Sequence, residues 1–374
     1  MAGYKIISAD SHANEPNEVY QRVPAEYRDR APRIEEIDGV RYNIFEGQSP
    51  FPVEAPNPLT EDDMHRYWRE GEEVGRVMHR AGGIDIPLRL ADQDVDGVSA
   101  EVIYPQAIFK VFASPDPGYQ KAFARVYNDW YEEVFGGYPD RWVVSAVIPM
   151  VNVDDAVEEA KRVARMGYRS LSVPVAMPAL PYNYPEYEPF WATAEELGIP
   201  VAFHVATQGP SPIPENTEPE KYGPGQDLAD TTRILLSAFG PLTLITAAGV
   251  LDRHPNMKFV LVECGIGWIA WVLQTMDEMV QKRHMWVEPK LGLLPSEYFR
   301  RQGYATFGDD AVGLRNRDIT GVETLMWGND YPHDEGTFPH SREVIERLFT
   351  DVPEDEKRKI VAENAAGLYG FPLD

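Results

Sequence analysis

The chain has 374 residues, and 60 acidic against 35 basic residues give it a formal net charge of −25 at pH 7. This acidity argues against nucleic acid or an anionic membrane as a partner, because both are negatively charged. The single cysteine, Cys264, excludes an internal disulfide framework and suits a reducing compartment. The sequence contains no uninterrupted run of about 18 apolar residues, the length that a membrane-spanning helix needs, and it therefore predicts a cytoplasmic protein.

The first predicted strand covers residues 4–10 and ends in a polar cluster, Asp10-Ser11-His12-Ala13-Asn14-Glu15-Pro16. Residues two apart on an extended segment point to the same side, so Asp10 and His12 can converge on one metal ion. Glu15 lies just past the strand, where a loop could bring its carboxylate to the same point. Turn formation is the alternative for this cluster, since Asp and Asn are common after strands.

Residues 17 to about 90 show no regular pattern and mix prolines, charges and aromatic residues, with one helix expected at 61–81. An irregular stretch of this length is typical of a lid or binding element, although a surface excursion without function is the alternative. We therefore expect one metal-dependent domain over residues 1–374, with a long insertion after the first strand.

From residue 91 onward, short apolar strands alternate with amphipathic helices. Strands are expected at 100–105, 142–148, 170–175, 199–205, 259–263, 304–307 and 324–330, and helices at 118–135, 153–166, 187–197, 268–283, 341–349 and 354–367. Continuous apolar strands indicate burial on both faces and hence a parallel sheet. With the first strand, eight such units favour an α/β fold of the (β/α)8 TIM-barrel type over an open doubly wound sheet.

Chemistry in such a barrel lies at the carboxyl ends of the strands. His204, Glu263 and Asp330 each close a predicted apolar strand, and His333 follows Asp330 by three residues. A lone histidine or glutamate there would more often be structural, but four strands ending in this way predict a metal site. The predicted ligands are Asp10, His12, Glu15, His204, Glu263 and Asp330.

The strand-one cluster, His204, the segment Arg253-His254-Pro255-Asn256-Met257-Lys258 and the segment Trp327-Gly328-Asn329-Asp330-Tyr331-Pro332-His333 together resemble the amidohydrolase superfamily. The similar branch contains aminocarboxymuconate-semialdehyde decarboxylase. The resemblance implies that Asp10, His12, His204 and Asp330 bind a metal, and that His254 is structural. The chain departs from the family pattern because Asp10 and Glu263 stand where histidines are usual, and because the strand at 170–175 has no lysine.

Two histidines with four carboxylates are typical of di-iron and di-manganese sites. The set resembles that of the non-heme di-iron monooxygenases of terpenoid (platensimycin-type) biosynthesis. This resemblance implies two divalent metal ions, expected to be iron, and hydroxylation of an apolar terpenoid-like small molecule with O2. Tyr104, Trp268 and Trp327 would bind that substrate, with core packing as the other explanation for these aromatic residues.

The alternative function is that of a hydrolase or non-oxidative decarboxylase acting on a small carboxylic acid or ester. It would use one zinc or manganese ion, with Glu263 or His333 as the acid–base group. The sequence does not reveal the oligomeric state, for which a homodimer is the general expectation.

Overall fold

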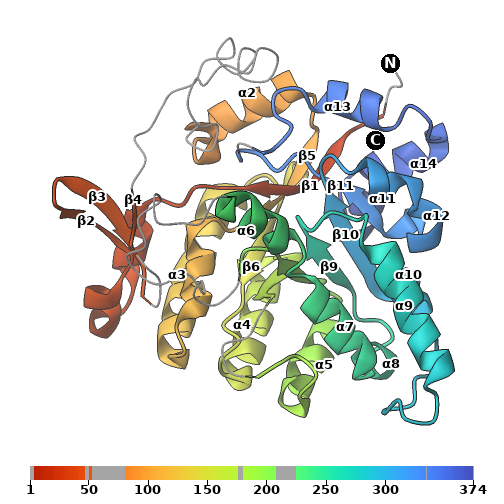
Figure 1. The fold of residues 1–374 in the computed structure, drawn as a ribbon. Helices are drawn as coiled ribbons and strands as arrows, with labels where there is room; N and C mark the ends of the chain where they lie inside the picture. The colour runs from red at the N-terminus through yellow and green to blue at the C-terminus, as the bar shows by residue number, and fades with distance from the viewer. Residues whose placement is uncertain are drawn as a thin grey trace.

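The computed structural model describes residues 4–46, 50–52, 81–175, 180–207, 225–333 and 335–373. Its largest sheet is parallel and has the strand order β1 (Ile7–His12), β5 (Ala100–Tyr104), β6 (Trp142–Val147), β7 (Ser170–Pro174), β8 (Val201–His204), β9 (Phe259–Val262), β10 (Gly303–Phe307) and β11 (Leu325–Trp327). A parallel bridge between Ser11 and Tyr331 brings β11 back to β1. The sheet is a nearly closed TIM barrel, which confirms the predicted fold class (Figure 1).

Helices follow the strands and cover the outside of the barrel (Figure 1). They are α2 (Ile86–Asp96), α3 (Pro117–Phe135), α4 (Val153–Met166), α5 (Glu188–Leu197), α6 (Gln226–Leu235), α7 (Phe239–Ala247), α8 (Val250–Arg253), α9 (Ile269–Lys282), α10 (Pro295–Gln302), α11 (Ala311–Arg315), α12 (Arg317–Thr320), α13 (Ser341–Leu348), α14 (Glu354–Arg358) and α15 (Asn364–Tyr369). Helix α4 spans the predicted range 153–166. It begins where the Asn152 side chain accepts from the Asp155 N–H and ends where Gly167 adopts a positive φ. Within the described ranges, no helix has the length and apolar character needed to cross a membrane.

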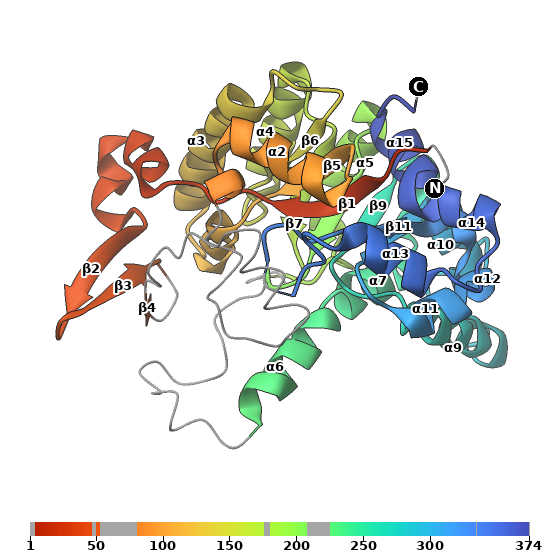
Figure 2. The same ribbon diagram turned by 90° about the horizontal axis from the view of Figure 1, so that it is seen from above.

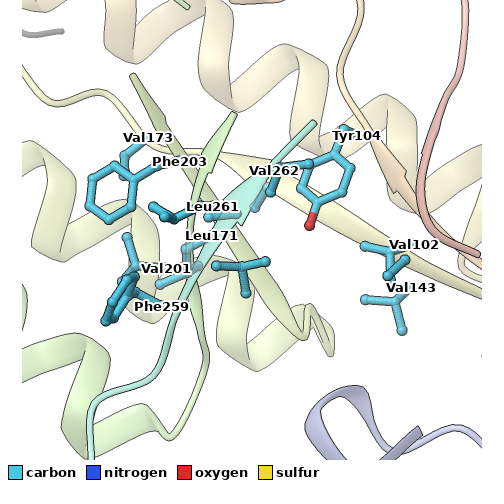
Figure 3. Packing of buried hydrophobic residues seen from close by; sticks show 14 of the residues in the cluster. Val102, Tyr104, Val143, Leu171, Val173, Val201, Phe203, Phe259, Leu261 and Val262 are labelled. Atoms are coloured by element: carbon cyan, nitrogen blue, oxygen red, sulfur yellow. The ribbon is translucent and has the colours of Figure 1, made fainter. Parts of the chain in front are cut away.

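Buried apolar side chains from neighbouring strands pack against one another along the sheet (Figure 3). Val102, Leu171, Val201 and Phe259 are each fully buried, as is Val262 at the end of β9. Because both faces of these strands are covered, their sequences are continuously apolar instead of alternating. The packed interior holds the strand ends in fixed positions.

The segment after β1 contains regular structure that the sequence analysis did not predict. Two short 3-10 helices, η1 (Asn17–Arg22) and η2 (Ala25–Arg30), precede an antiparallel sheet of β2 (Arg33–Ile37), β3 (Val40–Ile44) and β4 (Phe51–Pro52). This sheet lies at one end of the molecule, beyond α3 (Figure 2). Asp38 and Gly39 both have positive φ and form the two-residue turn between β2 and β3. An Asp-Gly pair is a strong hairpin signal, so this hairpin was predictable from the sequence.

The predicted helix at 61–81 lies outside the described residues except for its last residue. The insertion also ends earlier than expected, because α2 begins at Ile86. That the whole chain forms one domain stays a prediction.

Candidate metal centre and active site

Side chains from β1, β8, β9 and β11 meet at the carboxyl ends of these strands. His12 Nε2 lies 3.2 Å from His204 Nε2 and 3.3 Å from Asp330 Oδ1. His204 Nε2 is in turn 3.7 Å from Asp10 Oδ1 and 3.4 Å from Glu263 Oε2. The structure thus brings together five of the six predicted ligands.

The donor atoms of this cluster fit a cation. Asp10 Oδ1 and Asp330 Oδ1 are buried without a hydrogen-bond partner, which is costly for a carboxylate unless a cation lies beside it. The Nδ1 atoms of His12 and His204 donate to the carbonyl oxygens of Pro105 (2.9 Å) and Val205 (2.8 Å). These bonds leave each Nε2 with a lone pair, and two lone pairs face each other within the cluster. A divalent ion between them would satisfy both nitrogens and both orphaned oxygens.

The backbone turns sharply at two of the site carboxylates. Glu263 and Asp330 have φ values of 57° and 55°, in the left-handed region that residues other than glycine rarely adopt. Hydrogen bonds hold these conformations: the Glu263 N–H donates to Thr306 Oγ1 (2.8 Å), and the Asp330 N–H donates to Asp10 O (3.0 Å). Such strain is concentrated at functional sites, where the surrounding structure fixes it.

His333 adds a proton-holding group to the cluster. Its Nδ1 lies 3.0 Å from Asp330 Oδ2, its Nε2 lies 2.8 Å from Gln106 Oε1, and its ring stacks on that of His12 with centroids 4.2 Å apart. Burial alone would lower the pKa of His333, but the charge of Asp330 raises it above its ordinary value. With an acceptor at each ring nitrogen, His333 is placed to carry a proton on both.

The pKa values of the Asp330 and Glu263 carboxyl groups shift in opposite directions. Burial raises the pKa of Glu263, and the nearby charge of Asp330 raises it further. For Asp330, burial is outweighed by the charges and hydrogen bonds of His333 and His12, so its pKa falls below the usual range. Two acids whose pKa values are separated in this way suit different roles, Asp330 as a fixed anion and Glu263 as a proton carrier.

The segment that follows β5 forms one wall of the site. Pro105 orients His12, Gln106 bonds to His333, and the Phe109 ring in η5 (Ala107–Ala113) lies 5.0 Å from the His204 ring. The sequence analysis did not single out Pro105 or Gln106, because among polar residues it considered only metal-capable ones at strand ends. Gln106, a polar residue two positions after β5, was the available signal.

A cavity of about 970 Å³ opens over the metal-capable cluster. The cluster residues lie in its lining, and apolar surface comes from Phe45, Phe109, Ile234, Leu235 and Phe307. A cavity of this volume with a few convergent polar groups is typical of a site for a small organic ligand.

The three aromatic residues expected to bind substrate do not line this cavity. Tyr104 is buried against the rings of His12 and His204, and its hydroxyl lies 3.2 Å from that of Tyr369. Trp327 is fully buried, and the Trp268 indole N–H donates to Cys264 O at 2.8 Å. Their positions favour the packing explanation over contact with substrate.

Glu15, the sixth predicted ligand, does not join the groups of metal-capable residues found in the described part of the chain. Its Oε1 accepts a hydrogen bond from the Tyr20 hydroxyl (2.8 Å) and another from the Ile108 N–H. These bonds hold Oε1 against η1 and η5, whereas Oε2 is buried without a hydrogen-bond partner. That Glu15 is a metal ligand stays a prediction. Glu15 still lines the cavity.

We expect Glu15 to make the metal-free protein less stable as the pH rises. Burial raises its pKa from 4.5 to about 7, with the Tyr20 and Ile108 bonds opposing the shift. A carboxyl group whose pKa is higher in the folded than in the unfolded protein stabilises the fold in full at pH values below its unfolded pKa. This contribution is lost as the pH rises through its folded pKa. The free energy of unfolding of Glu15→Gln, relative to that of the parent, should therefore increase by roughly 3 kcal/mol as the pH rises from 4.5 to 8. Urea denaturation at each pH measures this difference. Parallel stability profiles for the two proteins would contradict this.

A buried polar face of α2 holds the junction between β1 and β11. Arg89, fully buried, donates to His12 O (2.8 Å), to Ser11 Oγ (3.0 Å) and to Glu101 Oε2 (2.9 Å). Asp92 accepts from the Tyr331 hydroxyl at 2.6 Å, one residue beyond Asp330. Figure 2 shows α2 beside β1. The helix thereby fixes the backbone on both sides of the metal-capable cluster.

A sequence profile of the amidohydrolase family matches residues 85–371. The chain is 26% identical over 333 residues to a gamma-resorcylate decarboxylase from Rhizobium sp., covering 82% of this chain and 91% of the relative. Among solved structures, an amidohydrolase from Mycobacterium avium subsp. paratuberculosis superposes with a TM-score of 0.78 at 19% identity, covering 100% of this chain and 99% of that one. A 5-carboxyvanillate decarboxylase from Novosphingobium aromaticivorans, complexed with manganese, has a TM-score of 0.67 at 16% identity and covers 99% and 97%.

These relatives overturn the expected monooxygenase. Two of the three are named as decarboxylases, so the comparisons support the alternative function instead. The expected pair of iron ions finds no support either, since the relative with a named metal carries manganese. The error arose because donor types do not by themselves fix the metal or the reaction. The family model covers most of the chain, and the chain belongs to the amidohydrolase family.

Proposed function

We propose that the protein is a metal-dependent, non-oxidative decarboxylase of an aromatic carboxylic acid. Asp10, His12, His204 and Asp330 would hold one divalent ion, for which manganese is the candidate given the metal in the related structure. The observation that carries the proposal is the placing of buried, orphaned carboxylate oxygens beside a proton-holding histidine, under a cavity large enough for a substituted ring.

Decarboxylation breaks the bond between a ring carbon and the carboxyl carbon. CO2 leaves, the bonding electron pair stays on the ring, and that carbon must take up one proton. A bound divalent ion supplies positive charge that holds the substrate oxygens. The apolar wall of Phe45, Phe109 and Phe307 keeps water from the ring.

Glu263 and His333 are the groups that can supply the proton. Both line the cavity, and both lie in the group of ligand atoms around His12. Hydrogen bonds to Asp330 and Gln106 fix the His333 ring in position. His333 can therefore return a proton to Glu263 after each turnover. Asp330 remains anionic in this scheme and orients His333.

The decisive test is anaerobic turnover. Protein loaded with Mn²⁺ should release one CO2 per molecule of a hydroxybenzoic acid such as 2,6-dihydroxybenzoate or 5-carboxyvanillate, with no O2 consumed. Glu263→Gln should lower kcat by at least about 100-fold, since positioned acid–base groups contribute about 10²–10⁴-fold. CO2 is followed by mass spectrometry and the product by chromatography. Turnover that requires O2, or no CO2 from either acid, would exclude the proposal.

A further inference from the structure

Strand β10 lies between the strands that lead to Glu263 and Asp330, but it contributes no carboxylate or imidazole to the metal-capable cluster. One of its side chains nevertheless contacts the cluster. The Thr306 hydroxyl oxygen lies 3.2 Å from Asp10 Oδ2 and 2.8 Å from the backbone nitrogen of Glu263. Thr306 is fully buried and is not among the described residues that line the cavity. It can therefore act on a bound molecule only through Asp10 and Glu263.

The chemistry of the two partners sets the direction of both hydrogen bonds. A backbone N–H can only donate, so the Thr306 oxygen accepts from Glu263 and the single hydroxyl proton is donated to the Asp10 carboxylate. Asp10 Oδ2 is thereby satisfied. Asp10 Oδ1 is buried without a hydrogen-bond partner, 3.7 Å from His204 Nε2 and 3.9 Å from His12 Nε2. The Thr306 hydroxyl thus decides which oxygen of Asp10 is left for a cation.

The same hydroxyl holds the backbone of the candidate proton donor. Glu263 has a φ of 57°, and the bond from its N–H to Thr306 Oγ1 holds this turn at the end of β9. The turn places the Glu263 carboxyl in the lining of the cavity. A displacement of about 1 Å in a reacting group can cost about 10²-fold in rate. The position of the Glu263 carboxyl therefore depends on a residue of the next strand.

We propose that Thr306 is a positioning residue that couples the metal site to the proton donor. Its hydroxyl proton orients Asp10 so that Oδ1 is left for the cation, and its oxygen holds the turn that carries Glu263. Because one hydroxyl makes both bonds, its loss disturbs metal binding and proton transfer together. This inference rests on the proposed function for the roles of Asp10 and Glu263.

The test compares Thr306→Val, which keeps the side-chain shape and loses the hydroxyl, with Thr306→Ser, which keeps the hydroxyl and loses a methyl group. Calorimetric titration should show a Mn²⁺ affinity about 10–100-fold lower for Thr306→Val than for the parent, as for other outer partners of metal ligands. At saturating Mn²⁺, its kcat for CO2 release from 2,6-dihydroxybenzoate should be at least about ten-fold lower, with KM within about three-fold. Thr306→Ser should stay within about three-fold of the parent in all three quantities. A residue with a packing role alone would give the opposite order, because only the serine variant loses volume.

Thr193→Val is the matched control, because Thr193 is also buried but donates to Pro189 O (2.8 Å) within α5. It should keep both the Mn²⁺ affinity and kcat. Thr306→Ala takes the place of Thr306→Val if the latter does not fold, as judged by circular dichroism. A loss of only one of the two properties in the folded variant, or an equal loss in Thr306→Ser, would overturn the inference.

The metal titration separates this inference from the decarboxylase proposal, because Mn²⁺ affinity does not depend on turnover. A parent protein that binds Mn²⁺ but releases no CO2 would count against the decarboxylase alone, and the affinities of the Thr306 variants would still decide whether Thr306 orients Asp10. A parent that binds no Mn²⁺ would overturn both.

Discussion

Replacing His204 by alanine lowers the affinity for Mn²⁺ by more than about 100-fold, because even partners outside the ligand set typically contribute 10–100-fold. His204 Nε2 faces both His12 Nε2 (3.2 Å) and Asp10 Oδ1 (3.7 Å), so its loss removes the donor that connects these two side chains. Decarboxylation should fall to background with it. Calorimetric titration gives the affinity, and elemental analysis after dialysis gives the metal content per chain.

His254→Ala is the matched control for that experiment. His254 is also a buried histidine, but its Nδ1 and Nε2 bond to Glu195 (3.0 Å) and Glu188 (2.9 Å), away from the cavity. This variant should lose stability and keep its metal. Stoichiometric metal in folded His204→Ala would mean that the site lies elsewhere.

Much of the site could be predicted because it follows from local rules. The two-residue period of a strand places Asp10 and His12 on one side, and the closed parallel sheet brings His204, Glu263 and Asp330 to the same end. Strand order and direction decide which end of the barrel these residues reach, whereas the conformations of Glu263 and Asp330 also depend on hydrogen bonds to Thr306 and Asp10. Apolar strands followed by amphipathic helices indicate both the order and the direction.

The rest depends on contacts between residues far apart in the chain. Glu15 Oε1 accepts a hydrogen bond from the Ile108 N–H, 93 residues away in sequence, which no pattern near residue 15 reveals. Gln106 reaches His333 across the mouth of the barrel, 227 residues away in sequence. The reaction was also beyond reach, since a carboxylate such as Glu263 can serve either as a ligand or as an acid, and the residue type is the same in both roles.

Replacing Arg89 by methionine should destabilise the protein by about 3–5 kcal/mol, the usual cost of leaving one partner of a buried ion pair unpaired. Arg89 and Glu101 are 0% and 1% exposed, so the Glu101 charge could not reach water in the variant. His12 O and Ser11 Oγ would lose their donor as well. Urea denaturation measures the loss. Arg22→Met, which breaks an exposed pair with Glu133, should cost less than about 1 kcal/mol.

Adding Glu101→Leu to Arg89→Met separates stability from metal binding. The double variant should recover most of the lost stability, because an apolar pair of similar volume often replaces a buried ion pair without net cost. The His12 carbonyl would still lack its donor, and the strand that carries two of the predicted ligands would be held less firmly at the junction with β11. We therefore expect Mn²⁺ affinity to stay reduced by about ten-fold or more, as for other outer partners of metal ligands. Full recovery of both properties would show that Arg89 acts on the fold alone.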